Sequence, residues 1–270
     1  MEADLQRRVQ RYGWDKAAAH YEDFWATQLQ PAQDLLLEKV AIVPGERVIE
    51  TACGTGLLTF RVTERLGATG HLLATDLSEK MVAAVRERAA RDGVLLDVRR
   101  MDAESLDVPD ASFDVALCAL GLMYCPDPVV AMREMHRVLV PGGRAAAAVW
   151  GARRTCGWAE IFPIVERRVA SDVCPLFFQL GNGDALAESF RIAGFASAAS
   201  ERLSVHLHYE TADDAIGAAF AGGPVAMAYS RFDDATRASA HAEYLESIAA
   251  FRRGDGYDIP GEFVVVTAGH

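Results

Sequence analysis

The chain has 270 residues, 51% of them hydrophobic, and a formal net charge of −11 at pH 7. This length can bury one large core, and the acidic balance argues against a general polyanion binder, because phosphate contacts need clustered Lys and Arg. The five cysteines are widely spaced and include no C-x-x-C pair, which argues against a zinc knuckle or a disulfide framework (Cys53, Cys118, Cys125, Cys156, Cys174). We therefore expect no nucleic-acid partner, no bound metal, and thiols that are buried or incidental.

The first 40 residues are predicted to be helical and are rich in aromatic side chains (Tyr12, Trp14, Tyr21, Phe24, Trp25). The opening stretch, MEADLQRRVQRYGWDK, alternates charges and has no apolar core segment, so it does not read as a signal peptide. No segment approaches the roughly 18 uncharged apolar residues of a membrane-spanning helix. We expect a cytoplasmic protein whose residues 1–40 form a helical cover over the rest of the chain.

Short apolar runs alternate with helix-period runs from residue 47 onward. The predicted strands are RVIET (47–51), HLLAT (71–75), VLLDVR (94–99), FDVALCAL (113–120) and RAAAAVW (144–150). The predicted helices between them cover 57–66, 78–92 and 127–139. Near-continuous apolar strands separated by helices indicate a parallel sheet covered on both faces. Residues 41–151 are therefore predicted to form a doubly wound α/β core.

The pattern becomes less regular after Trp150. Residues 151–183 mix Trp, Phe, Pro and Gly without a clear period. Further helices are predicted over 184–195, 211–223 and 233–251, and further strands over 199–209 and 262–268. Insertions at these places lie where a lid forms over the site of an open α/β sheet. We expect residues 152–270 to complete the sheet and to shape an acceptor pocket, all within a single domain.

A glycine-rich turn follows the first predicted strand, where residues 48–59 read VIETACGTGLLT. Gly54 and Gly56 permit unusual backbone dihedrals and a close approach to a ligand. A dinucleotide fingerprint would need a third glycine where this chain has Thr59. Asp76 lies 20 residues after Gly56 and suits a carboxylate that accepts both hydroxyls of a ribose. This arrangement serves any adenosine-containing ligand as well as it serves NAD.

Residues past the second and third strands narrow the choice of ligand. Asp102, in RRMDAESLDVPDASFD, can accept a hydrogen bond from the exocyclic amine of adenine, and Leu77 and Met81 offer apolar surfaces for the ring. The signals E-x-A-C-G-T-G, T-D-L-S, D-A, F-D-V-A and R-V-L-x-P-G-G, in this order, closely resemble the class I S-adenosylmethionine-dependent methyltransferases. The resemblance spans about residues 10–151, and it is greatest to the branch of ubiquinone and menaquinone biosynthesis C-methyltransferases.

The resemblance implies a Rossmann-like, seven-stranded, mostly parallel sheet with an antiparallel last strand and helical cap insertions, and S-adenosylmethionine as cofactor. It places Glu50 and the backbone of the turn around the methionine portion of the cofactor (Ala52, Cys53, Gly54, Gly56). It assigns Asp76 to the ribose, Leu77 and Met81 to the adenine faces, and Asp102 with the Ala103 backbone to the adenine edge. Ala52 stands where the family usually has glycine, so the turn is expected to lie slightly farther from the ligand.

Candidate catalytic residues are fewer, because methyl transfer from a sulfonium is an in-line displacement in which the protein mainly positions the reactants. A base is needed only when the nucleophile arrives protonated. His20 is a candidate base because it adjoins Tyr21, an aromatic side chain expected to close over the cofactor. Tyr124, in LGLMYCPD, follows the fourth strand where an acceptor would approach the sulfonium.

The sequence thus predicts an S-adenosylmethionine-dependent methyltransferase that acts on a small-molecule acceptor. Two other functions stay open at this point. One is a non-catalytic protein that binds S-adenosylmethionine or S-adenosylhomocysteine. The other is a dinucleotide-dependent oxidoreductase, which Thr59 disfavours. The acceptor atom, among C, N, O and S, and the oligomeric state are not set by the sequence.

Overall fold

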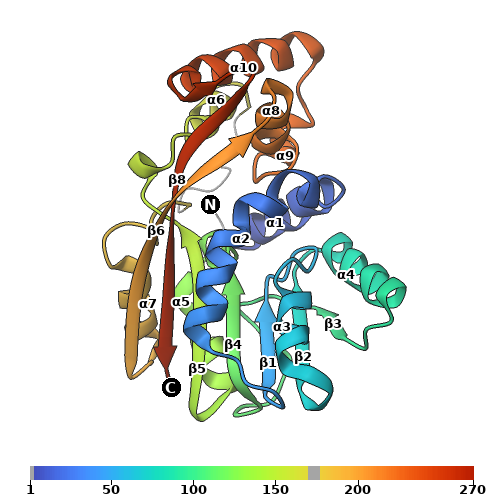
Figure 1. The fold of residues 1–270 in the computed structure, drawn as a ribbon, viewed down its shortest axis with the longest axis vertical. Helices are drawn as coiled ribbons and strands as arrows, with labels where there is room; N and C mark the ends of the chain where they lie inside the picture. The colour runs from blue at the N-terminus through green and yellow to red at the C-terminus, as the bar shows by residue number, and fades with distance from the viewer. Residues whose placement is uncertain (1–2, 170–176) are drawn as a thin grey trace.

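The computed structural model describes residues 3–169 and 177–270 and contains one eight-stranded sheet in the order β3-β2-β1-β4-β5-β8-β6, with β7 beside β8 (Figure 1). The strands are β1 (Arg47–Thr51), β2 (His71–Asp76), β3 (Asp97–Arg100), β4 (Phe113–Ala119), β5 (Leu139–Trp150), β6 (Ser197–Tyr209), β7 (Arg252–Arg253) and β8 (Gly256–Gly269). The first five strands run parallel, and β8 runs antiparallel to both β5 and β6. The predicted doubly wound, mostly parallel sheet is confirmed, with β7 as an addition.

Helices lie on both sides of this sheet (Figure 1). The α-helices are α1 (Ala3–Ala17), α2 (Tyr21–Val40), α3 (Thr59–Leu66), α4 (Glu79–Asp92), α5 (Pro128–Val138), α6 (Ile161–Glu166), α7 (Ala185–Ala193), α8 (Ala212–Phe220), α9 (Ala226–Tyr229) and α10 (Asp234–Ser247). Single 3-10 turns are η1 (Gly67–Thr69), η2 (Leu122–Tyr124), η3 (Arg153–Thr155) and η4 (Ala249–Phe251). Since strands β1 and β4 are buried on both faces, they read as the continuous apolar runs seen in the sequence.

Local capping explains where the core helices begin and end. Ser78 precedes α4, and its hydroxyl accepts a hydrogen bond from the Met81 backbone N–H at 3.2 Å. Gly93 ends that helix with a φ of 68°, a left-handed conformation that glycine adopts without steric cost. Asp127 caps α5 by accepting hydrogen bonds from the Val129 and Val130 N–H groups. These caps fix the loops that follow the strands.

A two-stranded ribbon carries an upper layer of helices above the sheet. The pairing of β5 with β8 stops at Trp150 and Phe263, whereas β6 and β8 stay paired as far as Tyr209 and Tyr257. The ribbon therefore continues past the end of β5, and α6, α8, α9 and α10 gather around its far end (Figure 1). Helix α1 lies between this upper layer and the sheet and packs against both α9 and α4.

Three segments differ from the sequence-based expectation. The N-terminal cover is two helices, because the chain turns at residues 18–20. The stretch 151–183, predicted without regular structure, contains α6. Strand β5 begins at Leu139, earlier than the predicted strand at 144–150, and its register against β4 shifts between Phe113 and Val115, where β5 contains Pro141-Gly142-Gly143. Residues 170–176 of the predicted lid, with Cys174, lie outside the described residues.

Within residues 3–169 and 177–270, no helix combines the length and the apolar character needed to cross a bilayer.

Candidate active site

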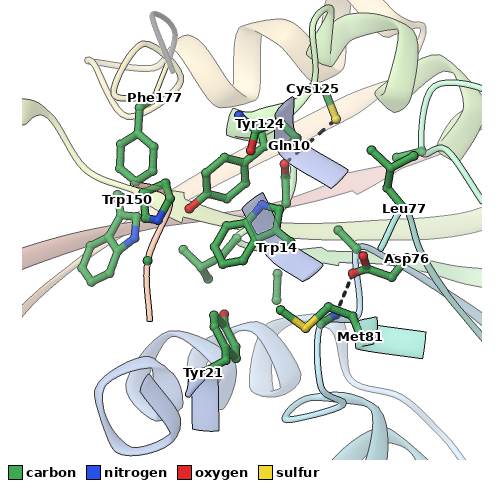
Figure 2. Close-up of a pocket in the computed structure, with 18 of the residues that line it drawn as sticks. Gln10, Trp14, Tyr21, Asp76, Leu77, Met81, Tyr124, Cys125, Trp150 and Phe177 are labelled. Atoms are coloured by element: carbon green, nitrogen blue, oxygen red, sulfur yellow. Dashed lines mark hydrogen bonds between the residues drawn. The ribbon is translucent and has the colours of Figure 1, made fainter. Parts of the chain in front are cut away.

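A large cavity lies at the carboxyl ends of the parallel strands, where open α/β sheets bind their ligands (Figure 2). It contains about 1110 Å³ of space free of protein atoms, part of it open to solvent. Its wall includes residues just past β1, β2, β3, β4 and β5, represented by Gly54, Leu77, Ala103, Leu120 and Trp150. Helices α1 and α2 and the upper layer complete the wall.

The glycine turn brings its backbone to the cavity in a left-handed conformation. Gly54 has a φ of 57° and Ala52 a φ of 53°, and both residues line the cavity. The left-handed region costs an alanine roughly 1–2 kcal/mol. A Cβ atom built on Gly121 would lie 2.4 Å from the Ala52 Cβ, so glycine at 121 leaves room for the methyl group that Ala52 adds. The departure at Ala52 is therefore matched by the absence of a side chain on the adjacent Gly121.

Asp76 ties the glycine turn to the end of β2. Its Oδ2 accepts a hydrogen bond from the Gly54 N–H at 2.9 Å, and its Oδ1 accepts one from the Ser78 N–H at 2.8 Å. Each oxygen of an ionised carboxylate can accept a second hydrogen bond, so Asp76 keeps capacity for a ligand. Burial raises the pKa of Asp76 to about 6, despite these two hydrogen bonds.

Glu50 lies behind the turn beside a second cavity, with about 300 Å³ of space, which Cys53 and Tyr21 also line. The Thr59 hydroxyl donates to Glu50 Oε2 at 2.7 Å, and burial raises the pKa of Glu50 to about 8. Thr59 thus uses its side chain for a buried hydrogen bond at the position where a dinucleotide fingerprint has glycine. The Cys53 thiol is buried, and burial raises its pKa, which fits a packing residue better than a nucleophile.

Gly56 lines neither of these two cavities, so its expected contact with the cofactor stays a prediction. Its φ is 93°, and a Cβ built there would lie 2.9 Å from the Phe60 ring. Glycine is required at this position by the backbone conformation and by the packing of α3 beneath the turn.

The loop after β3 supplies the next part of the wall. Asp102 and Ala103 line the cavity, as do Leu77 and Met81 from the loop and helix after β2. Asp102 Oδ2 lies 2.8 Å from Arg7 Nε, and its Oδ1 accepts a hydrogen bond from the Glu104 backbone N–H at 2.9 Å. The structure therefore brings together all the residues expected around adenine, and adds an arginine from α1 to them.

The opposite part of the wall is aromatic. Ring centroids lie 4.9 Å apart for Trp150 and Trp158, 5.9 Å apart for Trp25 and Trp150, and 5.7 Å apart for Trp158 and Phe177. Among residues 3–169 and 177–270, those that the upper layer and residues 158–224 contribute to this wall are uncharged (Trp158, Ile161, Phe177, Ala219, Gly223, Pro224). The charged wall residues are those of the other part (Arg7, Asp76, Asp102, Glu104). The cavity thus has a polar end and an uncharged aromatic end.

The two candidate catalytic residues have different positions. Tyr124 lines the cavity, with its ring 5.0 Å from Trp14 and 5.5 Å from Phe177, and Figure 2 shows it between the two ends. His20 is exposed at the turn before α2 and is not part of the cavity wall, which corrects its interpretation as a base. The next residue, Tyr21, does line the cavity, and burial raises the pKa of its hydroxyl.

Several wall residues were not predicted. Arg7, Gln10 and Trp14 share one face of α1, and their spacing of three and four residues is a signal that the sequence contains. Glu104 also went unnoticed, although it is only two residues from Asp102. The wall residues of the upper layer have no local signal, because only the path of the β6–β8 ribbon brings them to the cavity.

No group of three or more His, Cys, Asp or Glu side chains is arranged to hold a metal ion in the part of the chain that the structure describes.

Residues 49–147 match a protein family described as a methyltransferase domain. Over 161 residues the chain is 33% identical to the ubiquinone/menaquinone biosynthesis C-methyltransferase of Laribacter hongkongensis, which covers 58% of this chain. The matched part is 64% of that relative's length, so less than two thirds of it is represented.

Solved structures share the fold over most of the chain. The YcgJ protein of Bacillus subtilis has a TM-score of 0.62 at 15% identity and covers 89% of this chain and 98% of its own. The phosphoethanolamine N-methyltransferase 2 of Haemonchus contortus, solved with phosphomonomethylethanolamine and S-adenosylhomocysteine, has a TM-score of 0.58 at 14% identity and covers 88% of this chain and 52% of its own. At such identities the structures establish the fold alone.

Together these matches confirm the predicted resemblance to the class I S-adenosylmethionine-dependent methyltransferases, and the match to the methyltransferase-domain family covers residues 49–147.

Proposed function

We propose that the chain transfers a methyl group from S-adenosylmethionine to an uncharged aromatic small molecule. One observation carries the proposal: a single cavity joins a polar end, at loops that match a methyltransferase-domain family, to an aromatic end whose described wall residues are all uncharged. The similarity to the ubiquinone/menaquinone biosynthesis C-methyltransferase named above supports an aromatic acceptor. The acceptor class proposed for this chain is inferred from the residues of its own cavity wall.

The polar end suits the adenosine part of the cofactor. The two oxygens of Asp76 are held by the Gly54 and Ser78 N–H groups, which orient the carboxylate toward the hydroxyls of a ribose. Leu77 and Met81 offer the faces of an apolar slot for adenine. When bound, the cofactor supplies an electrophilic methyl group on its sulfonium.

The aromatic end suits the acceptor. Burying a charged group next to Trp150, Trp158 and Phe177 would be costly, because none of the described wall residues at this end carries a compensating charge. Flat apolar rings pack edge to face with such side chains at the centroid separations found here. These residues exclude water and hold the acceptor against the methyl group, and such positioning contributes up to about 7–11 kcal/mol to a two-substrate reaction.

Tyr124 is the wall residue best placed to assist a protonated nucleophile. It lies between Trp14 of α1 and Phe177, where the polar and aromatic ends meet. Its hydroxyl can accept a hydrogen bond from, or donate one to, an oxygen or nitrogen atom of the methyl acceptor. An acceptor that arrives deprotonated needs no such help. The expectations of a cytoplasmic location and of no nucleic-acid partner stay predictions.

The test is a transfer assay with methyl-labelled S-adenosylmethionine and two matched sets of acceptors. Phenols and hydroxylated bicyclic aromatics form one set, and aliphatic amines and carboxylates of similar size form the other. The proposal predicts label in the aromatic set only, and its loss with the Asp76→Ala variant. Label transferred only to aliphatic ions, or the same amount of label with Asp76→Ala, would contradict it.

A further inference from the structure

Helix α1 is fastened to the loop after β3 by Arg7. The Arg7 Nε atom lies 2.8 Å from Asp102 Oδ2, and its Nη2 donates to Glu104 Oε2 at 2.8 Å. The Glu104 side chain is only 3% exposed, and its other oxygen accepts a hydrogen bond from the Asp127 backbone N–H at 2.8 Å. Because one guanidinium serves two carboxylates, one of them buried, this contact is stronger than a surface ion pair.

Asp15 fastens the same helix, two turns further along, to the loop after β2. Its Oδ1 accepts hydrogen bonds from the Ser78 hydroxyl at 2.6 Å and from the Lys80 backbone N–H at 3.2 Å. The Ser78 N–H in turn donates to Asp76 Oδ1 at 2.8 Å. Ser78 therefore links Asp15 to Asp76, whose carboxylate is proposed to bind the ribose.

The segment between these two contacts faces the cavity. Gln10 and Trp14 line the wall, and Figure 2 shows the Trp14 side chain between Tyr21 and Tyr124, with Gln10 beside Tyr124. The Trp14 ring meets Tyr21 edge to face at 5.7 Å and Tyr124 at 5.0 Å. A ligand at the polar end is thus covered by α1 when both contacts are made.

We propose that Arg7 and Asp15 are positioning residues that hold α1 closed over the cofactor, so that both contacts must break before the cofactor exchanges. This inference rests on the proposed function. The two contacts end on the two loops that are proposed to hold adenine and ribose. Closure of α1 is therefore coupled to the order of those loops, and it places Trp14 between the cofactor and the solvent. Since α1 also packs against α9, its closure links the upper layer to the core.

A structural role alone predicts something different. If Arg7 only neutralised Glu104, its removal would lower thermal stability and leave the release of ligand unchanged. If it holds the lid, its removal speeds release and weakens binding at equilibrium, because the closed state contributes less. Rates of ligand release therefore separate the two roles.

The experiment measures the dissociation rate of S-adenosylhomocysteine by stopped-flow displacement, with tryptophan fluorescence as the signal. We expect release to be about 10-fold faster or more in Arg7→Gln and in Asp15→Asn, because each removes a charge-assisted contact of the closed state. Arg7→Lys keeps the positive charge but loses the planar guanidinium that reaches both carboxylates. Its release rate should therefore fall between those of wild type and Arg7→Gln. The matched controls are Arg8→Gln and Asp23→Asn, which change exposed residues of the same types and should release ligand at the wild-type rate.

Arg7→Gln leaves the Glu104 carboxylate without its cation, so the variant is at risk of misfolding. The double variant Arg7→Gln/Glu104→Gln removes that carboxylate and should show the same fast release in a folded protein. Wild-type release rates in this double variant and in Asp15→Asn would overturn the inference. Absence of S-adenosylhomocysteine binding to the wild-type protein would instead overturn the proposed function.

Discussion

The two ends of the cavity are built in different ways. The polar end draws on three consecutive loops between Ala52 and Glu104, and its side chains are held by hydrogen bonds to neighbouring backbone. The aromatic end draws on Trp25, Trp150, Trp158, Phe177 and Pro224, which lie far apart in the sequence and are held by ring contacts. The contrast suggests that the polar end fixes one ligand, whereas the aromatic end can be repacked for different acceptors.

If the two ends are independent, a change at the aromatic end should alter the stability of the fold and leave the affinity for the cofactor unchanged. Trp158 is buried among Trp25, Trp150, Phe162, Phe177 and Phe178. Trp158→Ala should lower the free energy of unfolding by about 3–5 kcal/mol, because it leaves a cavity in this cluster. The affinity for S-adenosylhomocysteine, measured by titration calorimetry on the folded fraction, should stay within a factor of about two.

Trp158→Phe is the milder variant if Trp158→Ala does not fold, and Ile192→Ala, at an exposed site, is the control that should leave stability unchanged. Loss of S-adenosylhomocysteine binding in folded Trp158→Phe would mean that the two ends are not independent.

A change at the polar end should leave the aromatic end intact and weaken the binding of the cofactor. Asp76→Ala removes the acceptor for the ribose hydroxyls, and its binding free energy for S-adenosylhomocysteine should fall by about 1–3 kcal/mol. The control is Glu79→Ala, an exposed acidic residue three positions further along, which should bind normally. Equal affinities of Asp76→Ala and wild type would show that the ribose lies elsewhere.

The glycine turn at the polar end should also respond to pH, through Glu50, which lies behind it beside the second cavity. Burial raises its pKa from an ordinary 4.5 to about 8, so the folded protein favours the protonated carboxyl. The stabilisation that protonated Glu50 contributes to the folded protein is therefore complete at low pH, and it is lost as the pH rises from about 4.5 to about 8. Glu50→Gln, whose amide oxygen can still accept from Thr59, should exceed wild type in unfolding free energy by about 1–2 kcal/mol at pH 8.

This gain should shrink toward pH 5, where Glu50 is protonated in the folded wild-type protein. The negative charge of Asp76 also raises the pKa of Glu50, and Glu50→Gln removes this repulsion at pH 8. Denaturant titrations at several pH values measure the gain. A gain that is independent of pH would show that Glu50 is not the titrating group.

The smallest effect is expected at Ala52. Ala52→Gly relieves a left-handed alanine but gives the unfolded chain more freedom, so stability should change by less than about 1 kcal/mol. The turn can then approach its ligand more closely, which should strengthen S-adenosylhomocysteine binding by about two- to threefold. Ala111→Gly is the matched control, because Ala111 also has a positive φ, 51°, outside the cavity wall. Weaker binding of Ala52→Gly would mean that the alanine methyl group contacts the ligand.

The contrast between the ends also explains what the sequence could predict. Gly54 and Asp76 could be expected at the cavity because the strand–loop–helix unit places its cavity-facing residues at fixed positions after each strand, and their contact with the cofactor stays a prediction. Asp102 was found for the same reason, but its partner Arg7 was not, since a contact across 95 positions leaves no local pattern. Gly56 was assigned to the ligand although its conformation serves the packing against Phe60. A glycine needed for a turn and a glycine needed for a ligand look alike in sequence.

The aromatic end could be suspected but not assembled. The sequence shows Trp and Phe residues within 151–183, yet the core of a lid and the wall of an acceptor pocket have the same composition. Whether these side chains line the cavity depends on how far the β6–β8 ribbon extends past β5. That length follows from strand pairing over long sequence distances. His20 was misjudged because a one-residue shift at the start of α2 separates an exposed side chain from Tyr21, which lines the cavity.

The most direct test of the account is a calorimetric titration of the wild-type protein with S-adenosylhomocysteine, with NADH as the control ligand. The account predicts one micromolar site for S-adenosylhomocysteine and no heat of binding for NADH. Binding of NADH, or no binding of S-adenosylhomocysteine, would contradict the assignment of the polar end to this cofactor.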